Sequence, residues 1–238
     1  MSLLAIGTVA FDAIETPLGK TDKIIGGAAT YITLAASYFT RTANLVAVVG
    51  DDFPEEYIRL LNDHGVNTEG LQVKKGEKSF FWSGRYDQDL NSRETLVTDL
   101  NVLATFDPII PESYQDCEFL MLGNLTPQVQ KTVIERLRTR PKLIAMDTMN
   151  FWMDVALPEL REVMTMVDVL SINDEEARLR AGLGDVGPGR GDGVLVAAGH
   201  PHGAVTSDLD ERADAVPLHL VEPLLPRGWA SALGGEHG

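Results

Sequence analysis

Residues 1 to about 180 alternate between short, continuous apolar runs and longer amphipathic segments, and this alternation constrains the fold more than any other feature. Apolar runs without polar breaks are typical of parallel strands that are buried on both faces. We expect strands at 3–7, 44–49, 119–122, 143–146 and 167–172, and helices at 28–39, 54–62, 127–138, 158–166 and from 174 onward. The pattern predicts an α/β fold in which helices cover both faces of a parallel sheet.

Region 71–101 departs from this rhythm, because its apolar and polar residues tend to alternate. Such alternation is typical of strands with one wet face. We interpret the region as a small antiparallel flap inserted into the α/β core, since Phe81 and Trp82 are costly to leave in water without a cover or a ligand. The alternative is a surface hairpin without a function.

Net charge and cysteine content narrow the classes of protein that the chain can represent. The 238 residues carry 20 basic and 35 acidic side chains, a net charge of −15, so a nucleic-acid partner or an anionic membrane surface is not expected. No stretch has the length and polarity of a membrane span or a signal peptide. Cys117 is the one cysteine, which excludes an intrachain disulfide. We expect a cytoplasmic protein.

From about residue 181 the composition changes sharply. Segment 181–238 holds 12 of the 22 glycines and 5 of the 12 prolines, and it contains no Ile, Phe, Tyr, Met, Lys, Asn or Gln. We therefore expect two parts, a core over 1–180 and a Gly/Pro-rich tail over 181–238 that is not native to the fold. One hypothesis is that much of the tail is translated out of the original reading frame. The alternative is a linker or disordered tail.

Polar residues follow several of the predicted strands. Asp12 comes shortly after the first strand, and Asp51, Asn124, Asp147 and Asn173 each lie at the end of a later strand. In open α/β sheets, ligands bind outside the carboxyl ends of the strands, so together these residues predict a site. Singly, each has a structural alternative as a helix cap or a turn residue.

Gly26-Gly27 precedes the first predicted helix and could bring the backbone close to a ligand. The pair does not belong to a G-x-G-x-x-G sequence, and the chain holds no G-x-x-x-x-G-K-[ST]. A nucleotide-dependent oxidoreductase on a doubly wound sheet is a competing hypothesis, and both the flap and the lack of this fingerprint at Gly26-Gly27 argue against it.

The order of these motifs resembles the ribokinase/PfkB family of carbohydrate kinases. The resemblance rests on Asp12, Gly26-Gly27, the run Gly50-Asp51-Asp52 followed by His64-Gly65-Val66-Asn67-Thr68, the flap, and Asn173 with Glu176 as N-x-x-E. It covers about residues 1–180. It implies a three-layer, Rossmann-like fold with a small β lid, and transfer of the γ-phosphoryl group of ATP to a sugar or nucleoside hydroxyl with Mg²⁺.

The resemblance also implies roles for individual residues. Asp12, Gly26, Gly27, Trp82, Arg85 and Asn124 would bind the substrate, and Asn173 and Glu176 would organise the magnesium ion near the phosphates. No side chain is assigned to ligate a metal directly. The lid could also pair two chains into a homodimer.

The sequence departs from the family pattern at two places. Tyr31 stands where many members have an Asn, four positions after the glycine pair. The family's D-T-x-G-A-G-D segment, which supplies the catalytic base and the anion hole, is not found intact. Gly189-Arg190-Gly191-Asp192 is a look-alike only sixteen residues after Glu176, too close for the intervening elements. We expect impaired or absent phosphoryl transfer, or a non-catalytic kinase remnant that binds sugar or only dimerises.

Overall fold

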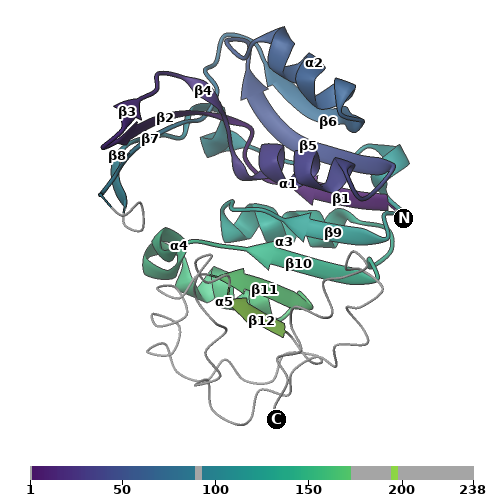
Figure 1. Cartoon of the computed structure of the whole chain (residues 1–238). Coiled ribbons are helices and arrows are strands. Elements are labelled where there is room, and N and C mark those ends of the chain that lie inside the picture. The colour runs from purple at the N-terminus through teal and green to yellow at the C-terminus, as the bar shows by residue number, and fades with distance from the viewer. Residues whose placement is uncertain (1, 89–92, 173–193, 198–238) are drawn as a thin grey trace, which may run out of the picture.

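The computed structural model describes residues 2–88, 93–172 and 194–197 (Figure 1). Seven parallel strands form the main sheet in the order β12-β11-β10-β9-β1-β5-β6. Their bounds are β1 Ser2–Ile6, β5 Thr42–Gly50, β6 Val66–Lys74, β9 Phe119–Leu122, β10 Leu143–Asp147, β11 Val169–Ile172 and β12 Val194–Ala197. The predicted α/β class with a parallel sheet is confirmed.

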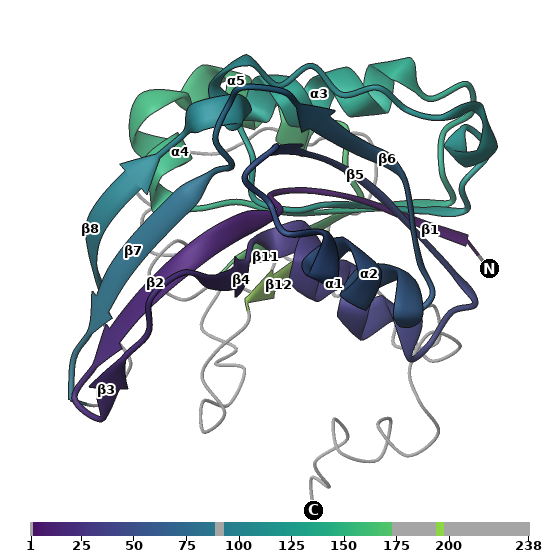
Figure 2. The ribbon, with the colours of Figure 1, turned by 90° about the horizontal axis from the view of Figure 1, so that it is seen from above.

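Helices lie on both faces of this sheet and make three layers (Figure 2). On one face are α1 Ala28–Ser37 and α2 Glu55–Asp63; on the other are α3 Pro127–Arg136, α4 Asn150–Val155 and α5 Leu157–Met164. The chain moves from β1 to β5 in one direction along the sheet and from β9 through β11 in the other. Because parallel crossovers are right-handed, these two directions place their helices on opposite faces.

Each face has its own apolar core. On the α3–α5 face, Leu4, Leu120 and Met146 pack with Val133 and Leu160, all at most 1% exposed. On the α1–α2 face, Leu45, Ala47 and Val49 of β5 pack with Ala29 and Leu61. Neighbouring residues of one strand point to opposite faces of the sheet. Because both faces are covered by apolar cores, the predicted apolar runs have no polar break.

A second, five-stranded sheet extends beyond the carboxyl ends of the main strands (Figure 1). It contains β2 Ala10–Thr16, β3 Gly19–Lys20, β4 Ile24–Gly26, β7 Phe81–Tyr86 and β8 Arg93–Asp99. We call this sheet the lid. The flap prediction is correct in placing β7 and β8 here, but the lid is mixed rather than purely antiparallel, because β2 and β7 pair in parallel. Residues 10–26 also belong to it, whereas 71–74 lie in β6 of the main sheet.

Other boundaries also differ from the sequence-based expectation. Residues 150–155 form α4, which the sequence did not suggest, and two short 3₁₀ turns, η1 Asn101–Thr105 and η2 Glu112–Tyr114, follow the lid. Four residues of the expected tail form β12, which pairs with β11, so the main sheet extends beyond residue 180. The expected helix from Asp174 lies outside the described residues. None of the helices within the described ranges is long and apolar enough to cross a membrane.

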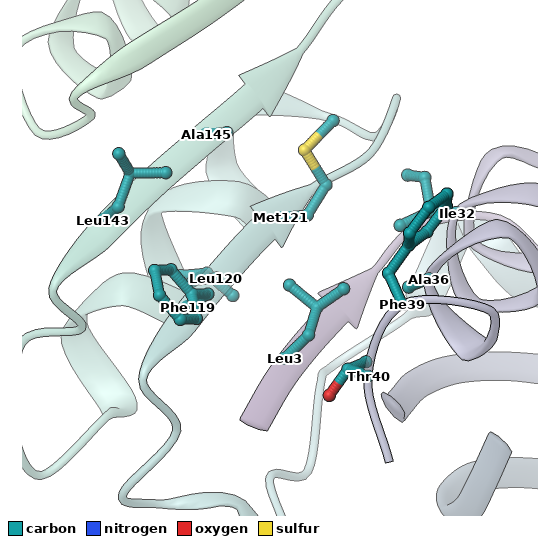
Figure 3. Close-up of a pocket in the computed structure, with 10 residues that line it drawn as sticks. All are labelled: Leu3, Ile32, Ala36, Phe39, Thr40, Phe119, Leu120, Met121, Leu143 and Ala145. Carbon is teal, nitrogen blue, oxygen red and sulfur yellow. The ribbon is translucent and has the colours of Figure 1, made fainter. Parts of the chain in front are cut away.

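An apolar groove of about 350 Å³ opens on the α1 side of the main sheet (Figure 3). Leu3, Phe119, Met121 and Leu143 form its floor, and the α1 side chains Ile32 and Ala36 line one edge together with Phe39. The full lining is Leu3, Ile32, Ala36, Phe39, Thr40, Phe119, Leu120, Met121, Leu143 and Ala145, with no ionisable side chain. This groove therefore has no group that could perform acid–base chemistry.

Candidate functional site

The carboxylate of Asp12 lies against the backbone of the glycine pair. Asp12 is in β2 and pairs with Ile24 of β4, which brings Gly26 beside it. A Cβ atom on Gly26 would lie 2.0 Å from Asp12 Oδ2, so only glycine leaves room for the carboxylate here. Burial raises the pKa of Asp12, and a backbone hydrogen bond from Gly27 acts in the opposite direction. The structure thus brings together three residues that the sequence analysis selected.

Thr8 holds the turn from the glycine pair into α1. Its Oγ1 accepts a hydrogen bond from the Ala28 N–H (2.9 Å), and its carbonyl oxygen accepts one from the Ala29 N–H (3.0 Å). Gly27 has φ of +96°, and a Cβ there would lie 2.3 Å from the Thr8 carbonyl oxygen. Both properties require glycine. The N–H groups of Ala28 and Ala29 at the start of α1 are therefore already bonded to Thr8, a residue that the sequence analysis missed.

Tyr31, the departure from the family pattern, lies one turn into α1, and its hydroxyl donates to the Ile25 carbonyl oxygen at 3.4 Å. Its side chain is half exposed. Desolvation, followed by the negative charge of Asp12 and the nearby Tyr86, raises the pKa of Tyr31. Tyr31 therefore stays a neutral phenol at neutral pH, beside the carboxylate.

The two faces of the lid carry different side chains. Asp12 and Trp82 are paired in parallel register and share one face, together with Gly84 and Tyr86. Arg85 pairs with Glu15 and lies on the other face, where its Nε donates to Glu15 Oε1 at 2.9 Å and it also contacts Glu94. The structure therefore brings Trp82 to the side of Asp12 and directs Arg85 away from it.

Phe81 shares the face of Arg85. It packs against the cluster that contains Phe11 and Phe53, and the Lys23 ammonium lies 5.0 Å from the Phe11 ring centroid and 5.6 Å from that of Phe81. Phe81 is one of the two aromatic residues that suggested a flap with a cover or a ligand. Its cover is thus the protein itself.

Asn124 follows β9, and both ends of its amide are engaged by the protein. Its Oδ1 accepts from Trp152 Nε1 (2.8 Å), and its Nδ2 donates to Met149 Sδ (3.1 Å). Both partners belong to the segment around α4. Asn124 fastens α4 to the end of β9 in this arrangement, so a substrate contact would require these bonds to exchange.

Gln130 of α3 ties the carboxyl ends of two strands together. Its Nε2 donates to the Gly123 and Asp147 carbonyl oxygens, each at 3.0 Å. Gln130 is fully buried, and its Oε1, like Thr148 Oγ1, is buried without a hydrogen-bond partner. The sequence gives no signal for this role, because a helical glutamine is usually solvent-exposed.

The side chains of the Gly50-Asp51-Asp52 run hydrogen-bond to a neighbouring loop and do not cap a helix. Asp52 Oδ1 accepts hydrogen bonds from the Ser79 N–H (2.8 Å) and Ser79 Oγ (2.7 Å), and Asp51 Oδ2 accepts from the Gly76 N–H (2.8 Å). No side chain caps the start of α2, where Pro54 is the N-cap residue. The motif therefore attaches the end of β5 to the loop that leads into the lid.

The remaining selected residues, Asn173, Glu176 and Asp192, lie outside the described residues. β11 ends at Ile172 on the carboxyl edge of the sheet, directly before Asn173, whereas β12 begins at Val194 on the amino edge, shortly after Asp192. Within the described ranges, no group of three or more His, Cys, Asp or Glu side chains could hold a metal ion.

Known proteins resemble this chain in sequence and in fold. Cytidine kinase of Thermococcus kodakarensis is 26% identical over 246 residues, which cover 99% of this chain and 86% of that protein. The nucleoside kinase of Methanocaldococcus jannaschii superposes with a TM-score of 0.62 at 18% identity, covering 77% of this chain and 64% of that one. A Burkholderia thailandensis nucleoside kinase in complex with ADP-inosine gives 0.59 at 16% identity, covering 76% and 63%.

The two structural matches show the fold alone, and this chain spans less than two thirds of the length of either kinase. The family model is broader evidence of kinship, because the pfkB family carbohydrate kinase model matches residues 2–202, most of the chain and more than the 1–180 expected. The match includes both sheets and the residues around Asp12. This chain belongs to the pfkB family of carbohydrate kinases.

Proposed function

We propose that the Asp12 site binds the hydroxyl groups of a sugar or nucleoside, as the acceptor for ATP-dependent phosphoryl transfer. The observation that carries this proposal is the position of the Asp12 carboxylate, pressed against Gly26 and hydrogen-bonded by the Gly27 backbone at the base of the lid. A partly desolvated carboxylate accepts strong hydrogen bonds from hydroxyl groups. The pKa of Asp12 is raised mainly by desolvation, which agrees with a carboxylate that is partly removed from water.

The names of the related kinases favour a nucleoside as the acceptor and an adenine nucleotide as the donor. The residues that would organise Mg²⁺ are Asn173 and Glu176, which follow the carboxyl end of β11. Bound ATP would supply the phosphoryl group, and Mg²⁺ would neutralise its charge. The contribution of the described residues is different: they bind and orient the acceptor and exclude water from it by means of the lid. The single, buried Cys117 fits a cytoplasmic location.

We further propose that phosphoryl transfer by these 238 residues is impaired. They contain no intact D-T-x-G-A-G-D segment, and the look-alike Asp192 precedes a strand that starts at the amino edge of the sheet. Positioning alone does not transfer the phosphoryl group when the base and the anion hole are missing. A second candidate function is therefore an acceptor-binding protein without catalysis, and the same lack of a motif favours it.

Binding measurements test the first proposal. We expect ribose, fructose or a nucleoside to raise the melting temperature of the wild-type chain. Asp12→Asn is expected to weaken this binding about ten- to hundredfold, because it removes charged hydrogen bonds. Gly26→Ala is expected to act similarly by displacing the carboxylate. Ser83→Ala, on the opposite lid face, is the matched control. Unchanged binding in Asp12→Asn would contradict the proposal.

An activity assay tests the impairment. With Mg²⁺, ATP and the acceptor that binds, we expect ADP release no faster than in the absence of protein. Sustained turnover that disappears in Asp192→Asn would show that the look-alike motif serves as the base, and would overturn the proposed impairment. Turnover that is unaffected by Asp192→Asn would overturn it as well and would point to another base.

A further inference from the structure

The indole of Trp82 lies along the inner face of the lid, over a glycine. A Cβ atom on Gly84 would lie 2.2 Å from Trp82 Cη2 and 2.4 Å from Cζ2, so the six-membered ring of the indole occupies the space above the Gly84 backbone. Glycine in the middle of a strand normally weakens a sheet and marks a close approach by another group. The group that approaches Gly84 is the indole of its own strand.

A hydrogen bond holds the five-membered ring of the indole. Trp82 Nε1 donates to Thr95 Oγ1 of β8 at 3.3 Å, and Thr95 is the residue that pairs with Gly84 across the two strands. The orientation of the ring is thus restrained by this hydrogen bond in addition to its attachment through Cβ. One of its faces is against Gly84, and the side chain as a whole is partly exposed, so part of the ring surface is accessible.

This ring lies on the same lid face as the Asp12 carboxylate. Asp12 and Trp82 are direct partners on neighbouring parallel strands, which run side by side about 4.8 Å apart (Figure 2). The indole extends from there toward Gly84, two residues or about 6.6 Å farther along the strand. Tyr86 follows on the same face, and it lies near enough to Tyr31 for the two hydroxyls to affect each other.

We propose that the exposed part of the Trp82 indole is a stacking platform for the planar base of a nucleoside whose ribose hydroxyls bind Asp12. The proposal rests on the proposed function and names its substrate class. A flat aromatic ring beside a carboxylate matches a molecule with a planar ring on one side and hydroxyl groups on the other. A simple sugar has no planar ring and would leave the platform in water.

Gly84 positions this platform, because its lack of a side chain allows the indole to lie close to the strand backbone. Any side chain at this position would push the indole away from the sheet and into the space where the base would stack. Trp82 and Gly84 are therefore expected to act as a pair, the former as the contact with the base and the latter as the residue that positions it.

The experiment compares cytidine and D-ribose as probes of the full chain, by calorimetry or by the shift in melting temperature. Trp82→Leu removes the aromatic ring and Trp82→Phe retains one. Gly84→Ala leaves the indole in place chemically but displaces it. Ser83→Ala, the neighbour on the opposite face of the lid, is the control, and Asp12→Asn reports on the hydroxyl contact.

We expect Trp82→Leu to weaken cytidine binding about five- to hundredfold, the range for stacking of a base on an aromatic side chain, with ribose binding unchanged. Gly84→Ala should weaken cytidine binding in the same way. Cytidine binding by Trp82→Phe should remain within about threefold of that of the wild type. Equal losses for both probes, equal effects of Leu and Phe, or a wild type without preference for cytidine over ribose would overturn the platform. Cytidine and ribose binding that survive Asp12→Asn would contradict the proposed function instead.

Discussion

At the scale of single residues, Asp12 combines a stability cost with its proposed role in binding. Its pKa is raised mainly by desolvation, so the folded protein binds a proton more tightly than the unfolded chain does. Stability is therefore lost as the pH rises from the ordinary pKa of an aspartate, about 3.9, through the higher pKa in the folded protein. The carboxylate can occupy this desolvated position because residue 26 is glycine. A Cβ at Gly26 would displace the carboxylate.

We predict that Asp12→Asn melts at a higher temperature than the wild type at neutral pH, although it binds the acceptor more weakly. The gain should vanish near pH 3, where Asp12 is protonated in both the folded and the unfolded protein. Melting curves between pH 3 and 8 measure it. The carboxylate accepts a hydrogen bond from the Gly27 backbone, and the amide oxygen of Asn can accept the same bond. A lower melting temperature at neutral pH would mean that desolvation is not the dominant effect.

At the scale of elements, the attachment of β5 to the loop before the lid depends on Asp52. Ser79 is 1% exposed, and its N–H and hydroxyl both donate to Asp52 Oδ1. We predict that Asp52→Ala lowers the free energy of unfolding by about 2 kcal/mol, because it leaves two buried donors without a partner. Asp51→Ala, whose carboxylate accepts one bond from the exposed Gly76 N–H, should cost less than about 1 kcal/mol.

Urea denaturation of both variants, followed by circular dichroism, measures this difference. Acceptor binding under native conditions should stay within about twofold of the wild type for either variant, because neither side chain contacts Asp12. If Asp52→Ala instead abolished binding while its unfolding midpoint was unchanged, the Gly-Asp-Asp run would have to be a ligand contact, as its position at a strand end had suggested.

The lid also shows which elements the sequence could and could not predict. Five of the seven main strands were predictable because they contain continuous apolar runs such as 119–122, whereas β6 and β12 were not predicted as strands. Residues 10–26 were not, because β2 crosses from the buried core at Ala10 to an exposed lid and mixes both patterns. The helix α4 is short and has no apolar period, and its attachment through Asn124 and Trp152 is a tertiary contact that sequence spacing does not reveal.

The same limit applies to the site. Asp12, Gly26 and Gly27 could be selected from the motif order, and the structure does bring them together. The faces of β7 could not be assigned without its register against β2, so Trp82 and Arg85 were selected as a pair although they point in opposite directions. Thr8, Gln130 and Gly84 carry no sequence signal, since their roles depend on which backbone atoms come close to them.

A homodimer through the lid remains a prediction, and β8 is the element on which it can be tested. β8 is an edge strand of the lid, and all seven of its residues are exposed, including Leu96 and Val97 at 38% and 39%. An edge with free backbone groups and apolar side chains favours pairing with another strand. We expect concentration-dependent dimers in sedimentation that Val97→Lys shifts to monomer. A monomer at every concentration up to about 100 µM would contradict lid pairing.

At the scale of the whole molecule, the two faces of the main sheet are covered unequally by the described helices. α3 and α5 cover β9 and β10 on one face, whereas α1 and α2 lie over the β1–β5–β6 half of the other (Figure 1). The difference follows from right-handed crossovers that run in opposite directions from β1 and β9. The apolar groove lies where the second face passes from α1 to β9 and β10, with Phe39 at its edge at 69% exposure (Figure 3).

We therefore predict that the protein binds the dye anilinonaphthalene sulfonate in its native state, and that Phe39→Asp lowers the dye fluorescence by about half or more, because a carboxylate at the edge of an apolar groove repels both the ring system and the sulfonate. The matched control is Leu18→Asp, the same change of charge at a 92% exposed apolar side chain in the lid turn. Acceptor binding should be the same in both variants, since Phe39 lies at the far end of α1 from the glycine pair. Equal loss of fluorescence in the two variants would show that the dye responds to net charge and not to this groove.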